Sequence, residues 1–356
     1  MNTLSEQAIP GIEAYSLEGI YALLQEMNLP AFRAKQLVQW IYSKGVHSYD
    51  EMTNLPKAMR ANLKEKAPLN IPSIADKQIS QDGSRKYVLE LVDGARVESV
   101  GIPSVDTGAK DQPRRLTVCF STQVGCPMQC AFCATGQEGL TRNLLPGEIA
   151  QQILCVQRDF GMKVSNVVAM GQGEPFLNYD NFIDALHIIN SPEALNIGAR
   201  HITVSSCGIL DGIERFGKEK EQFTLAISLH AARQDLRDEL MPRCKSMPLS
   251  RLKQSLCDYY AHAGRRISFE YLLINQVNDT KKDLDALINY CKGLPVYINL
   301  IPLNKVDGSV WKPSKKKTVQ QWLDTLEQAG IAVSLRNSRG KDIDGACGQL
   351  KNKRKA

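Results

Sequence analysis

Apolar residues in the first hundred positions recur with the periods of short helices and strands. One predicted helix begins just after Pro30, because proline suits a helix start. Its apolar face consists of Ala34, Leu37, Val38 and Ile41. A second helix is predicted over 56–66, and two strands over 87–92 and 97–102 flank an Asp-Gly turn. These residues therefore predict a small domain of helices and β-strands.

Beyond residue 115, short apolar runs alternate with helical faces. The runs typical of strands are LTVCFS, SNVVAMG, HITVSS, TLAISLH, ISFEYLLI, VYINLIP and IAVSLRN. Helical faces between them centre on Ile153, Leu186, Leu256, Leu287 and Leu323. This alternation predicts an α/β fold of about six or seven βα units, closed into a partial or near-complete barrel. An open, doubly wound sheet is the alternative, and both folds place chemistry at the C-terminal ends of the strands.

The patterns divide the chain into three parts. The segment 103–113 has the composition of a loop, so we place an accessory domain over 1–103. The βα-barrel core follows over 104–340, and 341–356 forms a C-terminal segment with a basic tail.

Composition is that of a folded chain, with 43% hydrophobic and 23% charged residues. No window approaches the roughly 20 consecutive apolar residues of a membrane span. The N-terminus lacks the basic start and apolar run of a secretory signal. We therefore expect a cytosolic protein with no membrane partner.

The net charge of +6 is concentrated near the C-terminus, where residues 304–356 hold 12 Lys and Arg against 5 Asp and Glu. The surplus lies in Lys315–Lys317 and in the tail residues Lys351, Lys353, Arg354 and Lys355. A basic patch of this kind suits a polyanion such as nucleic acid. A solubilising tail is the alternative.

Three of the ten cysteines, Cys126, Cys130 and Cys133, share one short loop with the spacing C-x3-C-x2-C. Thiolates are the ligands that iron–sulfur clusters prefer, and three of them leave one iron of a cube open for another ligand. A structural zinc site would need a fourth ligand, which Cys119 could supply. Spacing favours the cluster and leaves zinc as the alternative.

The motif after the first predicted barrel strand resembles the radical S-adenosylmethionine (SAM) superfamily. Neighbouring runs narrow the resemblance to the RlmN/Cfr family of RNA adenine methyltransferases, and within it to RlmN. These runs are PAFRAKQ around 31–36, STQVGCPMQCAFCATG at 121–136, GQGEP at 171–175, AISLHA at 226–231 and RNSRGKDIDGACGQL at 336–350.

The resemblance implies one 4Fe–4S cluster on the three cysteines and a set of residues that bind SAM. The SAM-binding set is Gly173, Glu174, Pro175, Ser205, Ser206, Ser228, Leu229, His230 and Asn304. Without the resemblance, each serine is equally well an ordinary turn hydroxyl, and His230 reads as a hydrogen-bonded structural histidine.

The resemblance also implies three catalytic residues. It assigns Cys347 as the cysteine that accepts a methyl group, Cys119 as the thiol that later forms a disulfide with it, and Glu98 as the proton acceptor. Residue type alone favours a buried small residue for Cys119 and a solvated charge for Glu98. The polar, glycine-containing surroundings of Cys347 favour a mobile, exposed segment.

The implied activity is methylation of adenosine C2 in the peptidyl transferase centre of 23S rRNA and in the tRNA anticodon loop. Two SAM molecules per turnover, a flavodoxin- or ferredoxin-like electron donor and a monomeric enzyme belong to this expectation. Three alternatives stay open: methylation at C8, a radical SAM enzyme acting on a protein or small molecule, and a non-catalytic RNA-binding protein stabilised by zinc.

Overall fold

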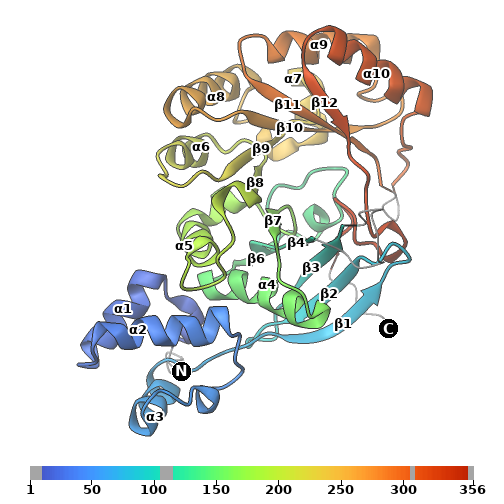
Figure 1. Cartoon of the computed structure of the whole chain (residues 1–356). Helices are drawn as coiled ribbons and strands as arrows, with labels where there is room; N and C mark the ends of the chain where they lie inside the picture. The colour runs from blue at the N-terminus through green and yellow to red at the C-terminus, as the bar shows by residue number, and fades with distance from the viewer. Residues whose placement is uncertain (1–9, 105–114, 305–308, 352–356) are drawn as a thin grey trace, which may run out of the picture.

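A computed structural model describes residues 10–104, 115–304 and 309–351 (Figure 1). The predicted N-terminal helices are confirmed as α2 (Ala31–Val38), which continues as a π-helix to Ser43, and α3 (Lys57–Lys66). An additional helix, α1 (Leu17–Glu26), packs on α2. Its first turn is capped by Ser16, whose hydroxyl accepts a hydrogen bond from the Gly19 amide.

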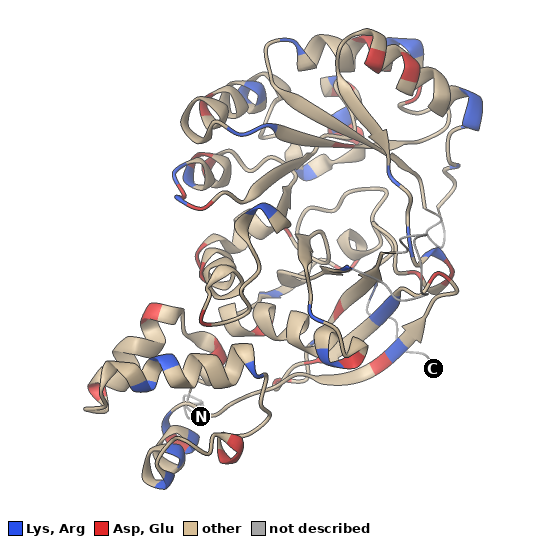
Figure 2. Ribbon diagram, viewed as in Figure 1, with Lys and Arg blue, Asp and Glu red and all other residues tan. Residues whose placement is uncertain are grey.

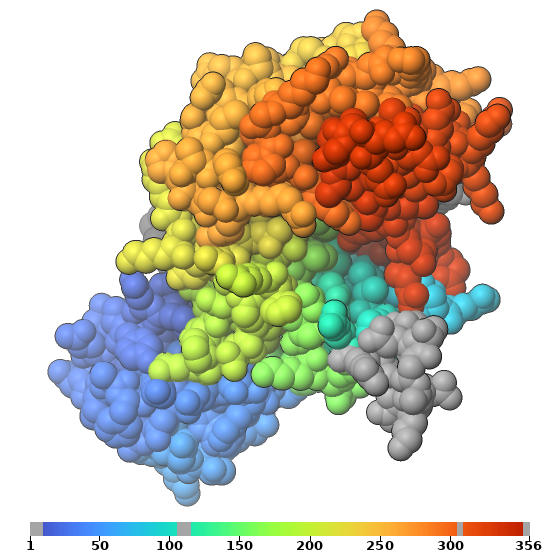
Figure 3. Space-filling model, turned by 45° about the horizontal axis from the view of Figure 1, so that its top comes forward, coloured from blue at the N-terminus to red at the C-terminus, as the bar shows by residue number. Residues whose placement is uncertain are grey.

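These helices form a lobe that packs beside the barrel helix α5 (Figure 3). Two contacts join the lobe to the loop after α5: the Lys35 ammonium lies 2.8 Å from the Glu193 carboxylate, and the Tyr21 hydroxyl donates to the same group. Charged residues of both signs are spread over the lobe and the barrel helices (Figure 2).

One ten-stranded sheet runs through the rest of the chain in the order β1-β2-β3-β4-β7-β8-β9-β10-β11-β12. Its strands are β1 (Ser73–Ile79), β2 (Arg85–Glu90), β3 (Arg96–Pro103), β4 (Leu116–Cys119), β7 (Asn166–Ala169), β8 (Ile202–Ser206), β9 (Thr224–Ser228), β10 (Ile267–Leu273), β11 (Val296–Pro302) and β12 (Ala332–Leu335). Strands β5 (Gln123–Gly125) and β6 (Leu140–Asn143) form a separate hairpin.

All seven strands predicted beyond residue 115 are present. In the order β4-β7-β8-β9-β10-β11-β12, each neighbouring pair is parallel. Helices connect them: α4 (Pro146–Phe160), α5 (Tyr179–Asn190), α6 (Leu210–Gly217), α7 (Gln234–Leu240), α8 (Leu249–Ala263), α9 (Lys281–Cys291) and α10 (Lys316–Gln328). The strands follow one another in chain order without reversal, whereas a doubly wound sheet reverses at a switch point. The fold is therefore a partial βα barrel.

The antiparallel strands β1, β2 and β3 extend the barrel sheet. Strand β3 pairs with β4 in the register Val100↔Cys119 and Pro103↔Leu116, so the sheet continues across the domain boundary expected at residue 103. The three-part division of the chain stays a prediction. Within the described ranges, no helix is long and apolar enough to cross a membrane.

Helix α10 anchors the end of the barrel through Trp322. The indole ring of Trp322 is buried 5.2 Å from the ring of Tyr271 on β10, and its N–H donates to the Asp279 carbonyl. The helix leads into β12, whose end starts the segment that carries Cys347. Packing of Trp322 therefore supports the part of the chain from which that cysteine comes.

Replacing Trp322 with alanine should lower the free energy of unfolding by about 3–5 kcal/mol, because a large aromatic side chain leaves a cavity. Urea unfolding of anaerobic protein measures the change. Gln321→Ala, on the exposed face of the same helix, is the control. Equal unfolding midpoints for the two variants would show that Trp322 does not anchor α10.

Candidate active site

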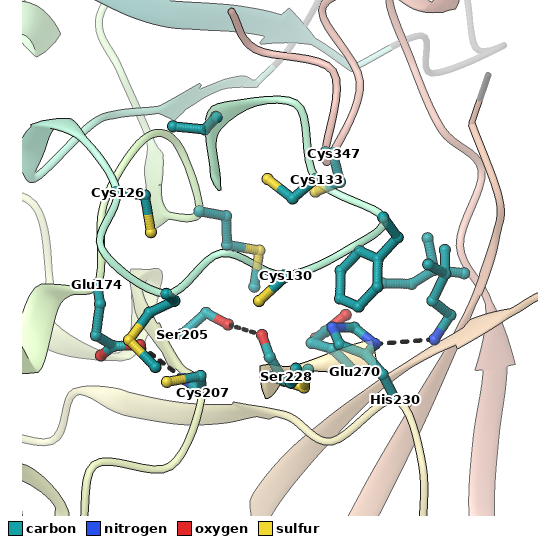
Figure 4. Close-up of a pocket in the computed structure, with 18 of the residues that line it drawn as sticks. Cys126, Cys130, Cys133, Glu174, Ser205, Cys207, Ser228, His230, Glu270 and Cys347 are labelled. Carbon is teal, nitrogen blue, oxygen red and sulfur yellow. Dashed lines mark hydrogen bonds between the residues drawn. The ribbon is translucent and has the colours of Figure 1, made fainter. Parts of the chain in front are cut away.

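The three cysteines lie on the loop that follows β5, at the C-terminal end of the first barrel strand. The Cys126 amide donates to the Gly139 carbonyl and the Cys133 amide to the Cys130 carbonyl, so the loop folds back on itself. Gly125 starts it with φ of 80°, and a Cβ there would come within 2.0 Å of the Gly139 oxygen. All three cysteines line one cavity (Figure 4).

The three thiols are the kind of ligands that a 4Fe–4S cluster takes. In such a cube each cysteine binds a different iron, and three cysteines leave one iron open for another ligand. Burial raises the pKa of Cys126 to about 12, so the neutral thiol is favoured until a metal binds.

Glu174 follows β7 and points into the same cavity (Figure 4). Its carboxylate is buried, accepts hydrogen bonds from the amides of Cys207 (2.7 Å) and Phe176 (3.1 Å), and has a pKa that burial raises. Gly173 has φ of 105°, and a Cβ there would lie 2.6 Å from the Thr122 hydroxyl. Only glycine therefore fits at this position, which lets the backbone approach a ligand.

Pro175 is buried and begins the short helical turn after Glu174, outside the residues that line the cavity. Ser205 and Ser228 do line it, at the ends of β8 and β9, with their hydroxyls 3.3 Å apart. Ser206 has the turn role, because its hydroxyl accepts from the amides of Gly208 and Ile209. Of the expected serines, two therefore face the cavity and one supports the loop.

His230 lines the cavity and is also held structurally. Its Nδ1 accepts from the Leu272 amide (3.1 Å), and its ring meets Phe132 edge-on, with centroids 4.7 Å apart. Burial lowers the His230 pKa to about 3, so the ring is neutral at physiological pH. Leu229 lies in the hydrophobic core, and its amide donates to the Glu270 carbonyl. Leu229 is not among the residues that line the cavity.

Cys347 reaches the cavity because its segment is docked, contrary to the expectation of a mobile, exposed segment. The Gly348 carbonyl accepts from the Ala134 amide (2.8 Å), and the Leu350 carbonyl accepts from the Thr135 hydroxyl (2.7 Å). The side-chain amide of Asn304 donates a hydrogen bond to the Cys347 carbonyl (3.2 Å). The flanking apolar residues are buried, which sequence polarity did not show.

Asn304 itself lines the cavity, and its buried Oδ1 has no hydrogen-bond partner among the described residues. An unsatisfied buried acceptor costs free energy, so a donor from a ligand would stabilise this side chain.

Cys119 is buried at the end of β4, in a cluster with Val100 and Leu350. Burial raises its pKa to about 12, the neighbouring Cys347 raises it further, and Arg336 opposes both effects. Burial also raises the Cys347 pKa, again opposed by Arg336. Cys119 and Cys347 therefore share an environment in which burial favours the neutral thiols and the Arg336 guanidinium favours the thiolates. Cys119 lies near Cys347 but is not among the residues that line the cavity with the three loop cysteines.

Glu98 is buried on β3 and is not the solvated charge that residue type favoured. Its carboxylate lies 3.5 Å from the Lys86 ammonium, and its pKa is raised to about 7, mainly by burial. Its Oε2 atom is buried without a hydrogen-bond partner in the described part of the chain.

Two charged residues that line the cavity, Glu270 and Arg336, were missed by sequence reasoning. Glu270 is a buried carboxylate within the apolar strand β10; it accepts from Asn299 (2.8 Å) and lies 3.5 Å from Arg336. A charged residue in an otherwise apolar strand was the available signal for it. Arg336 begins the last quoted motif, but nothing in the motif indicated that its side chain points inward.

A partial βα barrel with three cysteines at the end of its first strand and a Gly-Glu-Pro loop beside them defines the radical SAM class. The radical SAM superfamily model matches residues 120–290. The model described as the ribosomal RNA large subunit methyltransferase N-terminal domain matches residues 13–69. Members of the radical SAM class use a 4Fe–4S cluster and SAM, and the residues present fit both.

Individual relatives cover nearly the whole chain. A probable dual-specificity RNA methyltransferase RlmN of Syntrophomonas wolfei is 40% identical over 99% of both chains. A protein of the same description from Petrotoga mobilis is 43% identical over 93% of both. The crystal structure of a radical SAM methyltransferase from Sphaerobacter thermophilus superposes with a TM-score of 0.89 at 37% identity, covering 96% of this chain and 99% of that one. The chain belongs to the RlmN family.

Substituting any one of Cys126, Cys130 and Cys133 with alanine should abolish the cluster and all SAM cleavage, because a cube cannot be held by two thiolates here. Iron and sulfide analysis of anaerobically purified protein should give about four of each in the wild type. Cys257→Ala, on the distant helix α8, is the matched control and should keep its brown colour. A colourless wild type that binds stoichiometric zinc under iron-replete conditions would contradict the cluster.

Proposed function

We propose that this protein methylates C2 of adenosine in the peptidyl transferase centre of 23S rRNA and in the tRNA anticodon loop, through a methylcysteine at Cys347. The observation that carries the proposal is the docking of Cys347 into the cavity that the three loop cysteines line. The relatives from Syntrophomonas wolfei and Petrotoga mobilis are probable dual-specificity RNA methyltransferases, which supports RNA as the substrate.

The chemistry explains why a cysteine is needed. C2 of adenine is an electrophilic amidine carbon, so it does not attack the methyl group of SAM directly. The Cys347 thiolate instead takes the methyl group from a first SAM, leaving S-adenosylhomocysteine. A cluster held by Cys126, Cys130 and Cys133 would supply the electron that cleaves a second SAM to a 5′-deoxyadenosyl radical. Hydrogen abstraction from the Cys347 methyl group then gives a carbon radical that adds to C2.

Other residues in and around the cavity bind the cluster and SAM. Cys126, Cys130 and Cys133 hold the cluster. Glu174 accepts hydrogen bonds from the SAM ammonium. Further contacts to SAM come from Gly173, Pro175, Ser205, Ser206, Ser228, Leu229, His230 and Asn304, through side chains or backbone.

Product release requires Cys119 and Glu98. The adduct radical loses its unpaired electron, which would return to a cluster held by the three loop cysteines. The Cys119 thiolate then attacks the Cys347 sulfur to form a disulfide, and the carbon that leaves with the electron pair of the sulfur–carbon bond takes a proton from solvent to become the methyl group. Glu98 accepts the C2 proton. The disulfide is transient, because a reducing compartment returns both thiols to their free form.

The RNA must present an unstacked adenine to the mouth of the barrel. Loops of folded RNA offer bases that are already splayed, which suits both proposed substrates. The N-terminal lobe and the basic C-terminal region are the proposed RNA contacts. A flavodoxin- or ferredoxin-like electron donor and action as a monomer complete the proposal.

Methylation at C8 is the nearest competing activity, because both carbons are reached by the same radical chemistry. The choice depends on how adenine lies over Cys347. A cavity lined by Gly173, Glu174 and the further thiols Cys207 and Cys347, beside the three loop cysteines, argues against a non-catalytic zinc protein.

Cys119→Ala protein should stay covalently attached to RNA, because it still accepts the methyl group and adds to the base but has no thiol to break the sulfur–carbon bond. A high-mass band that RNase removes measures the adduct. The Cys119→Ala, Cys347→Ala double variant is the control and should show no such band. Normal turnover by Cys119→Ala without an adduct would make Cys119 a structural strand residue.

Neutralising Lys351, Lys353, Arg354 and Lys355 together should weaken RNA affinity and flatten its salt dependence, because fewer counterions are released. Of these, Lys351 is described, and the other three lie outside the described residues. Affinity measured across a salt series tests the effect, with cluster content as the control. Unchanged affinity and salt slope would leave the tail a solubilising end.

A further inference from the structure

Lys86 is placed beside Glu98 by the register of three neighbouring strands. In antiparallel pairs, residues directly opposite each other project from the same face. Lys86 on β2 and Cys119 on β4 both lie opposite Val100 of β3. Glu98 is two residues from Val100 and therefore shares its face. One face of the sheet thus presents Lys86, Glu98 and the thiol of Cys119.

This ion pair is buried to a degree that is uncommon for lysine and glutamate. Lys86 is 6% exposed and Glu98 is 1% exposed, with Nζ and Oε1 3.5 Å apart. Removing both charges from water costs free energy. An ion pair that served stability alone would have hydrogen bonds to both oxygens of the carboxylate. Here Oε2 has no hydrogen-bond partner among the described atoms. The arrangement leaves one oxygen of a buried carboxylate open.

Few other charged or polar groups act on this carboxylate. The backbone amide of Lys351, at the end of the docked C-terminal segment, donates a hydrogen bond to it and lowers its pKa. Glu138, from the end of the cluster loop, raises the pKa by repulsion. The ammonium of Lys86 is therefore the nearby cation that favours the charged form of Glu98, against burial.

We propose that Lys86 is a positioning residue that keeps the Glu98 carboxylate charged, with Oε2 free to accept the proton of the substrate base. This inference rests on the proposed function of the same site. In the step concerned, the C2–H bond of the adduct breaks, its electron pair stays in the purine ring, and the proton moves to Oε2, while the unpaired electron of the adduct would return to a cluster held by Cys126, Cys130 and Cys133. Glu98 becomes neutral, and its proton passes to solvent once the product leaves.

The charge on Lys86 sets the pH at which Glu98 works. Glu98 accepts a proton only when ionised, so the rate of adduct resolution falls as the pH drops through the Glu98 pKa of about 7. Without the ammonium, burial raises this pKa further. The acid limb of the rate profile therefore moves to higher pH.

Single-turnover resolution of the protein–RNA adduct, followed from pH 6 to 9, tests the role of Lys86. Lys86→Met should slow resolution at pH 7 by about fivefold or more, since a rise of one unit from a pKa of about 7 lowers the ionised fraction from about one half to about one eleventh. The loss should recover at alkaline pH, and Lys86→Arg should restore the wild-type limb. Methylation of Cys347, read by intact-protein mass, should be unaffected in each variant.

Lys77→Met is the matched control. Lys77 lies on the partly exposed strand β1, pairs with Asp159 of α4 and does not contact Glu98. Its profile should match the wild type. If Lys86→Met does not fold, as judged by iron content and circular dichroism, Lys86→Gln takes its place, with the same expected shift.

A Lys86→Met or Lys86→Gln profile with the wild-type midpoint and only a lower plateau would overturn the inference and make Lys86 a structural partner. Failure of the proposed function gives a different result, because the Cys119→Ala protein would then form no RNA adduct at all.

Discussion

The docking of residues 346–350 on the loop that carries the three cysteines is the constraint on which the site depends. Two hydrogen bonds, from Ala134 to the Gly348 carbonyl and from Thr135 to the Leu350 carbonyl, fix the segment. Together they bring Cys347, which is more than two hundred residues from Cys119 in the sequence, close enough to affect the pKa of the Cys119 thiol. Under the proposed function, loss of this docking would remove the cysteine that carries the methyl group from the cavity that the three loop cysteines line.

Burial away from water decides which acidic groups and thiols in and around the cavity are ionised. Burial raises the pKa of Glu174, Glu98 and Glu270, and of Cys119, Cys126 and Cys347, so each of these carboxyl groups is charged only where a specific partner favours it. Backbone amides supply that partner for Glu174, Arg336 for Glu270 and Lys86 for Glu98. A low local dielectric also makes each of these contacts stronger than it would be in water. Ionisation in this site is therefore controlled residue by residue.

Periodicity was sufficient to predict the alternating strands and helices, because parallel strands buried between helices are nearly continuous apolar runs, but it left an open, doubly wound sheet as the alternative to a barrel. The short helices α6 and α7 carried too few turns for a clear period. Residue type predicted the cluster cysteines and the resemblance named Cys119, Glu98 and Cys347. Neither predicted that the Cys347 segment is docked or that Lys86 faces Glu98, because both depend on register and long-range contacts. Hydroxyl roles such as that of Ser206 likewise depend on local geometry.

The central claim is that a cysteine-borne carbon is added to C2 of an RNA adenine. Mass-spectrometric nucleoside analysis of 23S rRNA and tRNA, from cells with and without this gene, tests it most directly. The account predicts 2-methyladenosine in both RNAs only when the gene is present, and its loss when Cys347 is replaced by alanine. Finding 8-methyladenosine in its place, or RNA that is identical in the two strains, would contradict the account.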